Sequence, residues 1–401
     1  MASPEQADAT KVAIFGGGGG GSVMAAGLVE ALPNVDISVI VPTGDSGSKT
    51  GELREQFGGP AVGDARKVLA AVAGNQEAGE LFGKRFARDD TLYTYTGPLY
   101  DNLVRAGKDP DAVSKVFERT GELVTELYDQ GRSLKGHTLG NLILTAMSHD
   151  NNGDITPGIR LASSWLDARA QVIPATAYPH NVMMHDPAAG LILKGEGIID
   201  DYTPADPTEV SVWLEPSLLS DNRRIEDLEE IKEALLAREA MRPPRATREA
   251  IGAIAAADVA ILAPGSPWTS HMPALLPRGI ARALEAQGGH GGLWVAVANL
   301  VEEKPGLDLG THMDAIHSTT RRRVTHIIHN TATEGLPEGS IPLRFDSNAF
   351  DLGDAKEIGA ALVDSHIVES DPNDPIAHLR SPGHHDVWKV ANVLRGLVVV
   401  E

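Results

Sequence analysis

Three short turns, each placed after an apolar segment, carry residue types suited to binding an anion. In the first, KVAIF (Lys11–Phe15) runs into six consecutive glycines, Gly16–Gly21, and then into a helical apolar pattern. Glycine lets the backbone approach a ligand closely, and the free N–H groups at a helix N-terminus carry partial positive charge. The segment therefore predicts a phosphate site. The alternative, a flexible linker, fits poorly because both flanks are well patterned.

A second turn of small residues, PTGDSGSKTGELRE, follows the apolar segment ISVIV (Ile37–Val41). Asp45 in this turn could hold a metal ion or a ribose hydroxyl, and the alternative is a solvated loop in which Asp45 only caps the turn. Asp64 stands at the start of a predicted helix, at about Gly63–Ala73, as either an N-cap or a site carboxylate. Arg66 beside it offers the planar fork that phosphates favour.

The third turn lies in DVAILAPGSPWTSHMPALL, where a predicted strand ends at Pro264–Ser266. Thr269 and Ser270 are predicted to cap a helix that continues to about Gln287. A strand, loop and helix in this order form an anion cup, and the alternative is a well-capped helix without a ligand. Asn299 follows the next apolar strand, LWVAVA, and could contact a base or a sugar.

Histidines give weaker signals. Gly136–Asn141 (GHTLGN) opens an apolar helix, and a lone histidine such as His137 is more often structural than catalytic, so both roles stay open. His384 and His385 are expected at the surface. The sequence has no H-E-x-x-H, P-loop lysine or G-x-S-x-G motif, and it has no cysteine. These absences argue against a zinc enzyme, an esterase and thiolate catalysis.

Parallel strands are the scaffold that would bring the three turns together. Short aliphatic segments alternate with helical patterns along the chain, and only 4% of the residues are aromatic. This alternation predicts an α/β fold, a three-layer Rossmann-like parallel sheet with helices on both faces. Because the carboxyl ends of parallel strands meet at one edge, the turns are expected to lie at the same edge.

The predicted organisation is a domain at residues 11–335 followed by a C-terminal extension at 336–401 that packs on it. Two helical insertions are expected, at about 90–135 and 217–247. The first contains one clear amphipathic helix, with apolar residues from Val113 to Leu127 on one stripe. The second is highly charged and is interrupted by Pro243 and Pro244.

Charge and composition limit the partners. The chain has 55 acidic and 35 basic residues, a formal charge of −20, which repels phosphate backbones and anionic lipids. We therefore expect no nucleic-acid and no membrane partner. The N-terminal segment lacks a signal-peptide pattern, and the absence of cysteine suits a reducing compartment, so a cytoplasmic location is expected.

The order of these motifs resembles the 2-phospho-L-lactate transferase (CofD) family, and most closely its gluconeogenesis-factor branch, whose members bind UDP-sugars. The matching segments run from FGGGGGG through VIVPTGDSGSKTGELRE, GHTLGNLIL and GEGIID to IAAADVAILAPGSPWTS. The resemblance implies a nucleotide-diphosphate ligand at the carboxyl edge of the sheet, with Asp45 and Asp64 as catalytic residues and Asp45 as a ligand to Mg²⁺. It places these residues at the nucleotide: Gly17, Gly18, Gly20, Gly51, Arg54, His137, Asn141, Gly265, Ser266, Thr269, Ser270 and Asn299.

Three departures from the family pattern bear on activity. Gly19 stands where a threonine is usual, Ser46 replaces the second of two paired aspartates, and LVEEKPG follows Asn299 in place of a shorter form. Two functions therefore stay open: a regulatory or metabolic binder of a nucleotide-linked metabolite of the UDP-sugar type, and a Mg²⁺-dependent phosphotransferase that moves a phospholactyl-type group to an alcohol. An NAD-dependent dehydrogenase is disfavoured, because no acidic residue ends the second strand. A homodimer is expected.

Overall fold

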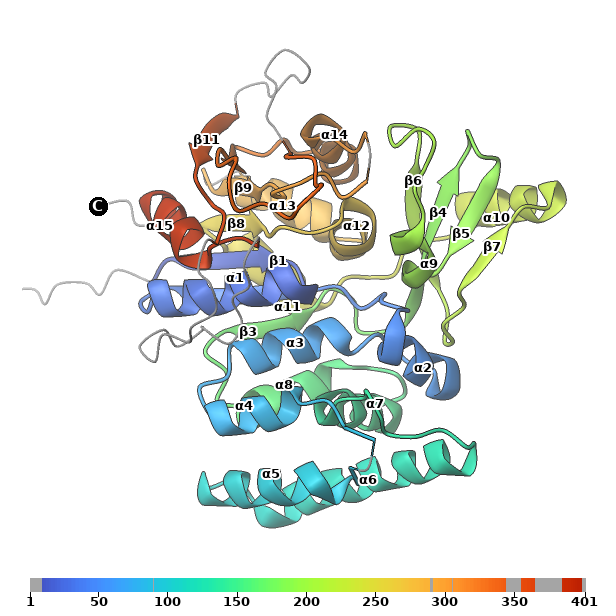
Figure 1. Cartoon of the computed structure of the whole chain (residues 1–401), viewed down its shortest axis with the longest axis vertical. Coiled ribbons are helices and arrows are strands. Elements are labelled where there is room, and N and C mark those ends of the chain that lie inside the picture. The colour runs from blue at the N-terminus through green and yellow to red at the C-terminus, as the bar shows by residue number, and fades with distance from the viewer. Residues whose placement is uncertain are drawn as a thin grey trace, which may run out of the picture.

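The computed structural model describes residues 9–88, 90–288, 291–304, 306–343, 355–364 and 384–398. Within these residues, a seven-stranded parallel sheet has the order β11-β10-β9-β8-β1-β2-β3 (Figure 1). Its strands are β1 (Lys11–Phe15), β2 (Asp36–Val41), β3 (Gln171–Pro174), β8 (Val259–Leu262), β9 (Leu293–Val297), β10 (His326–Asn330) and β11 (Lys356–Ala360). The predicted α/β fold is confirmed.

Helices cover both faces of this sheet, because side chains alternate along each strand. In β1, Val12 and Ile14 pack into one apolar core, while Ala13 and Phe15 pack into another on the opposite face. The first core includes α1 (Gly18–Ala31), α3 (Gly63–Ala71) and α15 (Val387–Val398). The second includes α11 (Arg248–Ala256), α13 (Ile280–Gly288) and α14 (Leu309–Thr320).

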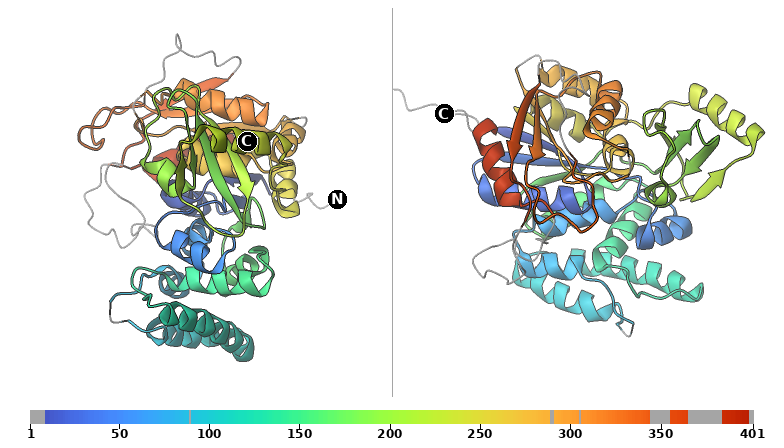
Figure 2. Two further views of the ribbon diagram at one scale, coloured as in Figure 1. Left: turned by 90° about the vertical axis from the view of Figure 1, so that its right-hand side faces the viewer. Right: turned by 45° about the horizontal axis from the view of Figure 1, so that its top comes forward.

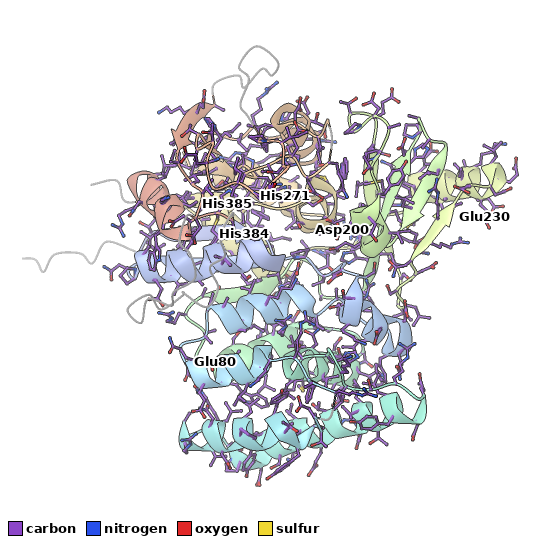
Figure 3. All side chains as sticks on the ribbon, viewed as in Figure 1. Glu80, Asp200, Glu230, His271, His384 and His385 are labelled. Atoms are coloured by element: carbon purple, nitrogen blue, oxygen red, sulfur yellow. The ribbon has the colours of Figure 1, made fainter. Side chains whose placement is uncertain are left out.

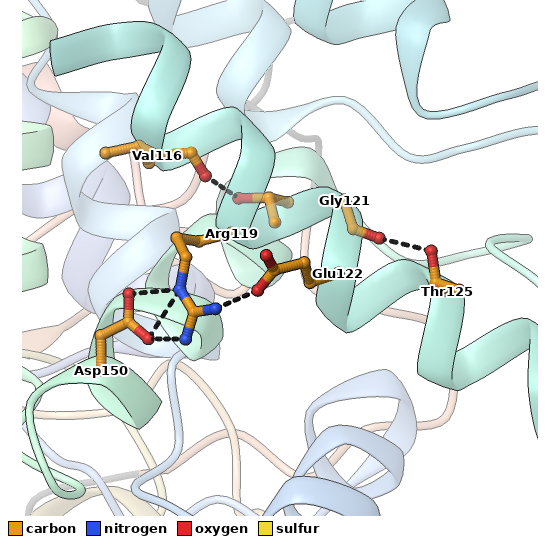
Figure 4. A network of polar contacts seen from close by, with 7 residues as sticks. Val116, Arg119, Gly121, Glu122, Thr125 and Asp150 are labelled. Atoms are coloured by element: carbon orange, nitrogen blue, oxygen red, sulfur yellow. Dashed lines mark hydrogen bonds and ion pairs between the residues drawn. The ribbon is translucent and has the colours of Figure 1, made fainter.

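A group of helices extends the α3 side of the molecule, with α5 and α6 farthest from the sheet (Figure 1). These helices are α2 (Ser48–Phe57), α4 (Gln76–Gly83), α5 (Tyr93–Arg105), α6 (Pro110–Asp129), α7 (Leu139–Asp150) and α8 (Thr156–Trp165). The insertion at 90–135 thus holds two helices, where the sequence indicated one clearly. Arg119 of α6 bonds Asp150 at the end of α7 and Glu122 on its own helix (Figure 4). The buried stripe from Val113 to Leu127 lies on α6, as predicted.

A second sheet was not foreseen from the sequence. It is antiparallel, with the order β6-β4-β5-β7, and it stands beside the main sheet (Figure 2). Its elements are β4 (His180–Asp186), β5 (Leu191–Lys194), β6 (Ser211–Pro216) and β7 (Arg223–Ile225), with α9 (Glu196–Asp201) and α10 (Leu228–Ala240). The segment 217–247, predicted as a helical insertion, therefore also contributes a strand. Local sequence could not show this, because β7 forms a strand only by pairing with β5.

The C-terminal extension contributes to the same layers. Its strand β11 pairs with β10 at the sheet edge, and α15 packs on α1. The contact is close: a Cβ placed on Gly27 would stand 2.0 Å from Val387 Cγ2. Much of 344–383 lies outside the described residues. Among the helices that are described, none combines the length and apolarity needed to cross a bilayer.

Candidate functional site

The hexaglycine turn and the third turn lie side by side at the carboxyl edge of the sheet. They follow the paired strands β1 and β8, and Ala263 N donates to Phe15 O at 3.0 Å. A Cβ on Gly20 would stand 2.6 Å from Pro264 O. The two turns therefore contact each other, as the topology of parallel strands predicts. Helix α1 starts at Gly18 directly above this contact, so its unpaired N–H groups lie in the same region.

Asp64 reaches the glycine turn from α3. A Cβ on Gly17 would lie 2.2 Å from Asp64 Oδ2, so only glycine leaves room for this carboxylate. Val62, not Asp64, is the N-cap of α3, which leaves the Asp64 side chain free to point toward the turn. Its Oδ1 accepts from Lys67 Nζ at 3.2 Å. Asp64 thus contacts the first turn of the candidate site.

Asp45 belongs to a cluster of carboxylates around Asp64. Burial, and then the charge of Asp64, raise the pKa of Asp45 to about 6. Burial, and then the charges of Asp45 and Asp64, raise the pKa of Glu196 on α9. The pKa of the more exposed Asp200, also on α9, is raised chiefly by burial. The cluster joins the second turn, α3 and α9. In Figure 3, Asp200 lies between α9 and the main domain.

The third turn is held by side chains from other elements. The carboxamide of Asn299 pairs with the backbone of Gly265, accepting from its N–H at 2.8 Å and donating to its C=O at 3.0 Å. His271 Nε2 lies 2.9 Å from Ala263 O. The hydroxyls of Ser266 and Thr269 lie close enough to the carboxylates of Glu303 and Asp200, respectively, to lower their pKa values, but burial is the larger effect and raises the pKa of both carboxyls.

The helix after this turn differs from the prediction. Ser266 is the N-cap, and its hydroxyl accepts from Thr269 N at 3.3 Å, so Thr269 and Ser270 are not the caps. Both residues lie in a π-helical turn, Pro267–His271, which is followed by a short α12 (Met272–Leu275) before α13 begins at Ile280. The predicted continuous helix to about Gln287 is therefore wrong. Pro277, which has no N–H to donate, separates α12 from α13.

Arg54, predicted at the nucleotide, is buried and bonds the protein itself. Its guanidinium donates to the carbonyl oxygens of Gly44 at 3.0 Å, Asp45 at 2.9 Å and His180 at 2.7 Å. Burial lowers its pKa to about 10. Arg54 therefore fastens the second turn to β4 of the small sheet. Gly51 packs under the same turn, where a Cβ would meet Ser46 O at 2.2 Å.

His137 and Asn141 lie at the N-terminus of α7. His137 is fully buried, and its Nε2 lies 3.3 Å from Glu52 Oε2 without hydrogen-bond geometry. Burial, and then the charge of Lys49, lower the pKa of His137 to about 4. Asn141 Oδ1 accepts from Arg66 Nε at 3.2 Å. Both predicted residues thus belong to one helix terminus, and His137 is neutral at pH 7.

Comparison with known proteins identifies the family. Residues 12–366 match the family described as 2-phospho-L-lactate transferase CofD. The chain belongs to this family. It is 27% identical over 398 residues to the gluconeogenesis factor of Bacillus subtilis, covering 97% of this chain and 98% of that protein. It is 31% identical over 319 residues to a putative gluconeogenesis factor of a Nostoc species, covering 78% of this chain and 53% of that protein.

The fold likeness extends to a solved structure. A crystal structure of a Bacillus halodurans protein superposes with a TM-score of 0.66 and 24% identity, covering 96% of this chain and 99% of that one. This likeness concerns the fold, which is shared along nearly the whole chain. Because the match covers nearly the whole of this CofD-family chain, the shared fold includes the small sheet and the C-terminal elements as well as the main sheet.

Three carboxylates of this CofD-family protein were missed as site residues. Glu196 and Asp200 lie in GEGIID, a motif that carried the family resemblance, and Glu303 lies in LVEEKPG, where the chain departs from the usual pattern. The sequence therefore marked both segments as relevant to the family's site, one by resemblance and one by departure. What the sequence lacked was the position of α9, which the small sheet sets against the second turn: Gly197 N donates to Ser46 Oγ at 3.2 Å.

Two other findings concern places outside the predicted site. His384 is exposed, as expected, but His385 is only partly exposed; its Nε2 lies 3.0 Å from Ala298 O, and burial lowers its pKa to about 4. A cavity of about 740 Å³ lies at the amino end of β1 and β2 and along the edge strand β3, and is lined by residues such as Lys11 and Gln171. None of the predicted site residues lines this cavity.

Proposed function

We propose that the chain binds a nucleotide-diphosphate-linked metabolite of the UDP-sugar type at the contact of the two turns, in a regulatory or metabolic role. One observation carries this proposal: the first turn of α1 and the Pro264–Ser266 turn meet within van der Waals contact. Such a helix terminus favours an anion by about 0.3–1 kcal/mol, and by up to about 2 kcal/mol when partly buried. The names of the relatives support a metabolic role, since several are called gluconeogenesis factors.

The carboxylate cluster favours a Mg²⁺ ion beside the diphosphate. Burial, and then the mutual repulsion of Asp45, Asp64 and Glu196, raise the pKa values of Asp45 and Glu196. Mg²⁺ prefers oxygen ligands and is commonly held by one or two carboxylates, water and substrate phosphates. That pattern fits here, since no three His, Asp or Glu side chains among the described residues enclose a metal position by themselves. Asp45 and Asp64 would hold the ion, and it would offset their repulsion of phosphate.

A second function is favoured by one specific observation. The pKa of Asp45, raised to about 6, lies near neutrality, where a carboxylate can accept the proton of an attacking alcohol. A Mg²⁺-dependent phosphotransferase would use Asp45 in this way, with Asp64 in place of Asp45 as the residue that holds the ion and with the turns holding the phosphates. Ser46, which replaces the second of the family's paired aspartates, supplies no second carboxylate, and its hydroxyl donates to Asn222 Oδ1 at 2.7 Å.

The test compares ligands by thermal shift and calorimetry. UDP-glucose, GDP and NAD are each added with and without Mg²⁺. UDP-glucose at about 100 times its dissociation constant should add about 2.7 kcal/mol to the free energy of unfolding. Stabilisation by NAD alone would contradict the proposal. Binding of UDP-glucose without turnover of any alcohol acceptor favours the regulatory role, and Mg²⁺-dependent transfer to an acceptor favours the second function.

A further inference from the structure

Basic side chains gather around the first turn of α7, although the protein as a whole is strongly acidic. Arg66 Nε donates to Asn141 in this turn, and Arg85 Nη1 donates to Gly136 O at 2.7 Å, just before the helix. The charges of Lys49 and Arg132 act on the neighbouring His137 and lower its pKa, after the larger effect of burial. The nearby carboxylate of Glu52 is bonded to Lys49 at 2.6 Å. The region therefore has an excess of positive charge.

Arg66 is the buried member of this group, with 9% of its surface exposed. Burial, and then the charge of Arg85, lower its pKa to about 10. Within the described ranges, Nε is its only hydrogen-bonded nitrogen, and no carboxylate lies within ion-pair distance of it. The carboxylate of Asp64 acts on Arg66 only through its charge, which raises the pKa of Arg66, and it forms an ion pair with Lys67. Its two terminal nitrogens have no hydrogen-bond partner among the described residues and are not fully enclosed by protein, so they can donate to an anion that reaches them.

The helix itself supplies further donors. Thr138 Oγ1 accepts from Asn141 N at 3.3 Å, which leaves the backbone N–H groups of Leu139 and Gly140 without an acceptor among the described residues. A Cβ on Gly140 would lie 2.7 Å from Arg66 Cγ, so the turn rests directly on the arginine. His137 adds a second sign of a ligand: it is fully buried, and its Nδ1 has no hydrogen-bond partner in the described structure.

We propose that Arg66, Arg85 and the first turn of α7 form a second anion subsite, which takes a carboxylate or phosphate group separate from the diphosphate. The inference rests on the proposed function for its relation to the nucleotide. The charge of Asp64 acts on Arg66, and Asp64 also contacts Gly17 in the hexaglycine turn. The second anion subsite and the diphosphate subsite are therefore neighbours. The second anion comes either from the same ligand, as in a nucleotide-linked sugar acid, or from a separate small acid.

The experiment titrates the full chain with UDP-glucose and with UDP-glucuronate, which differ by one carboxylate. Because charge-assisted hydrogen bonds are strong, the wild type should bind the glucuronate about tenfold more tightly. Arg66→Gln should lower affinity for UDP-glucuronate much more than for UDP-glucose. Arg85→Gln should also lower affinity for UDP-glucuronate more than for UDP-glucose. Because Arg85 is exposed, this variant should fold normally, and a loss of affinity in it cannot come from a folding defect. Arg119→Gln on α6 is the matched control and should change neither affinity.

A second arm identifies the source of the anion. Inorganic phosphate is titrated into protein saturated with UDP-glucose, and binding that Arg66→Gln abolishes would indicate a separate acid. Equal affinity for the two nucleotides together with no phosphate binding would overturn the subsite. If UDP-glucose fails to bind at all, the proposed function fails, and phosphate is then titrated alone. Phosphate binding that Arg66→Gln and Arg85→Gln both weaken would still support the subsite, and binding that neither weakens would refute it.

Discussion

The carboxylate of Asp64 occupies the space that a side chain at position 17 would fill: a Cβ on Gly17 would lie 2.2 Å from its Oδ2. Residues 47 positions apart in the chain thus meet at the contact of α3 with the glycine turn. Position 17 needs glycine because the Asp64 carboxylate occupies the space of a side chain, whether or not a ligand is bound. The relationship also supplies matched variants, because Gly19 in the same turn has no atom within 4 Å of its Cβ position.

Gly17→Ala should therefore destabilise the protein and weaken nucleotide binding, whereas Gly19→Ala should change stability little. The alanine methyl must displace Asp64, which costs about 1–3 kcal/mol for an overpacked site. Chemical denaturation measures the first effect and calorimetry with UDP-glucose the second. Gly19→Thr, which restores the hydroxyl usual in the family, should fold normally because the space is open. Equal losses in the position 17 and 19 alanine variants would contradict this account.

Stability should fall as pH rises from about 4 to 6, through the titration of Asp45. Its pKa rises on folding from an ordinary 3.8 to about 6, so in this window the folded state binds more protons than the unfolded state. The charged carboxylate therefore opposes folding above pH 6, and the raised pKa of Glu196 acts in the same direction.

Asp45→Asn should remove part of this dependence, raising Tm at pH 7.5 more than at pH 4. The amide oxygen can still accept from Gly47 N, which bonds Asp45 Oδ1 at 2.6 Å. Mg²⁺ should stabilise the wild type at pH 7.5, and the variant less. Thermal melts across this pH range measure both effects. An identical pH profile for wild type and variant would show that Asp45 titrates normally.

Asn299→Ala should loosen the third turn, because it removes two hydrogen bonds to Gly265. Leaving the partially buried N–H and C=O unpaired costs about 1–3 kcal/mol, and nucleotide affinity should fall with it. Asn299→Asp keeps the acceptor for the N–H of Gly265 but loses the donor to its C=O, so its stability should be intermediate. Urea unfolding provides the measurement, and an alanine variant as stable as wild type would disprove the role.

Glu303→Gln should tighten nucleotide binding several-fold at pH 7.5. The carboxylate of Glu303 lies near the hydroxyl of Ser266, a residue predicted at the nucleotide, and its negative charge repels phosphate. Because burial raises its pKa, the difference between wild type and variant should shrink as the pH is lowered and the carboxyl becomes neutral. Calorimetry at two pH values tests this. Weaker binding by the variant would instead indicate that Glu303 contacts the ligand directly.

The sequence by itself determined the parallel fold and the three turns. Glycine, proline and aliphatic runs act through local backbone preferences, so Gly16–Gly21 and Pro264–Ser266 could be placed at the ends of buried strands before any contact was known. The topology of parallel strands then brought them to one edge. Asp45 and Asp64 were predicted as site residues in the same way, because each lies in or beside such a turn.

Only the tertiary structure decided what the polar side chains around these turns do. Arg54 resembles a phosphate ligand in sequence, but its guanidinium is bonded to the carbonyl of His180, which is 126 positions away. Glu196 joins the acidic cluster because a second sheet, whose assembly local patterns do not show, places α9 against the second turn and Asp45. Strand pairing and the electrostatics of buried groups depend on residues distant in the chain, and no local pattern contains their positions.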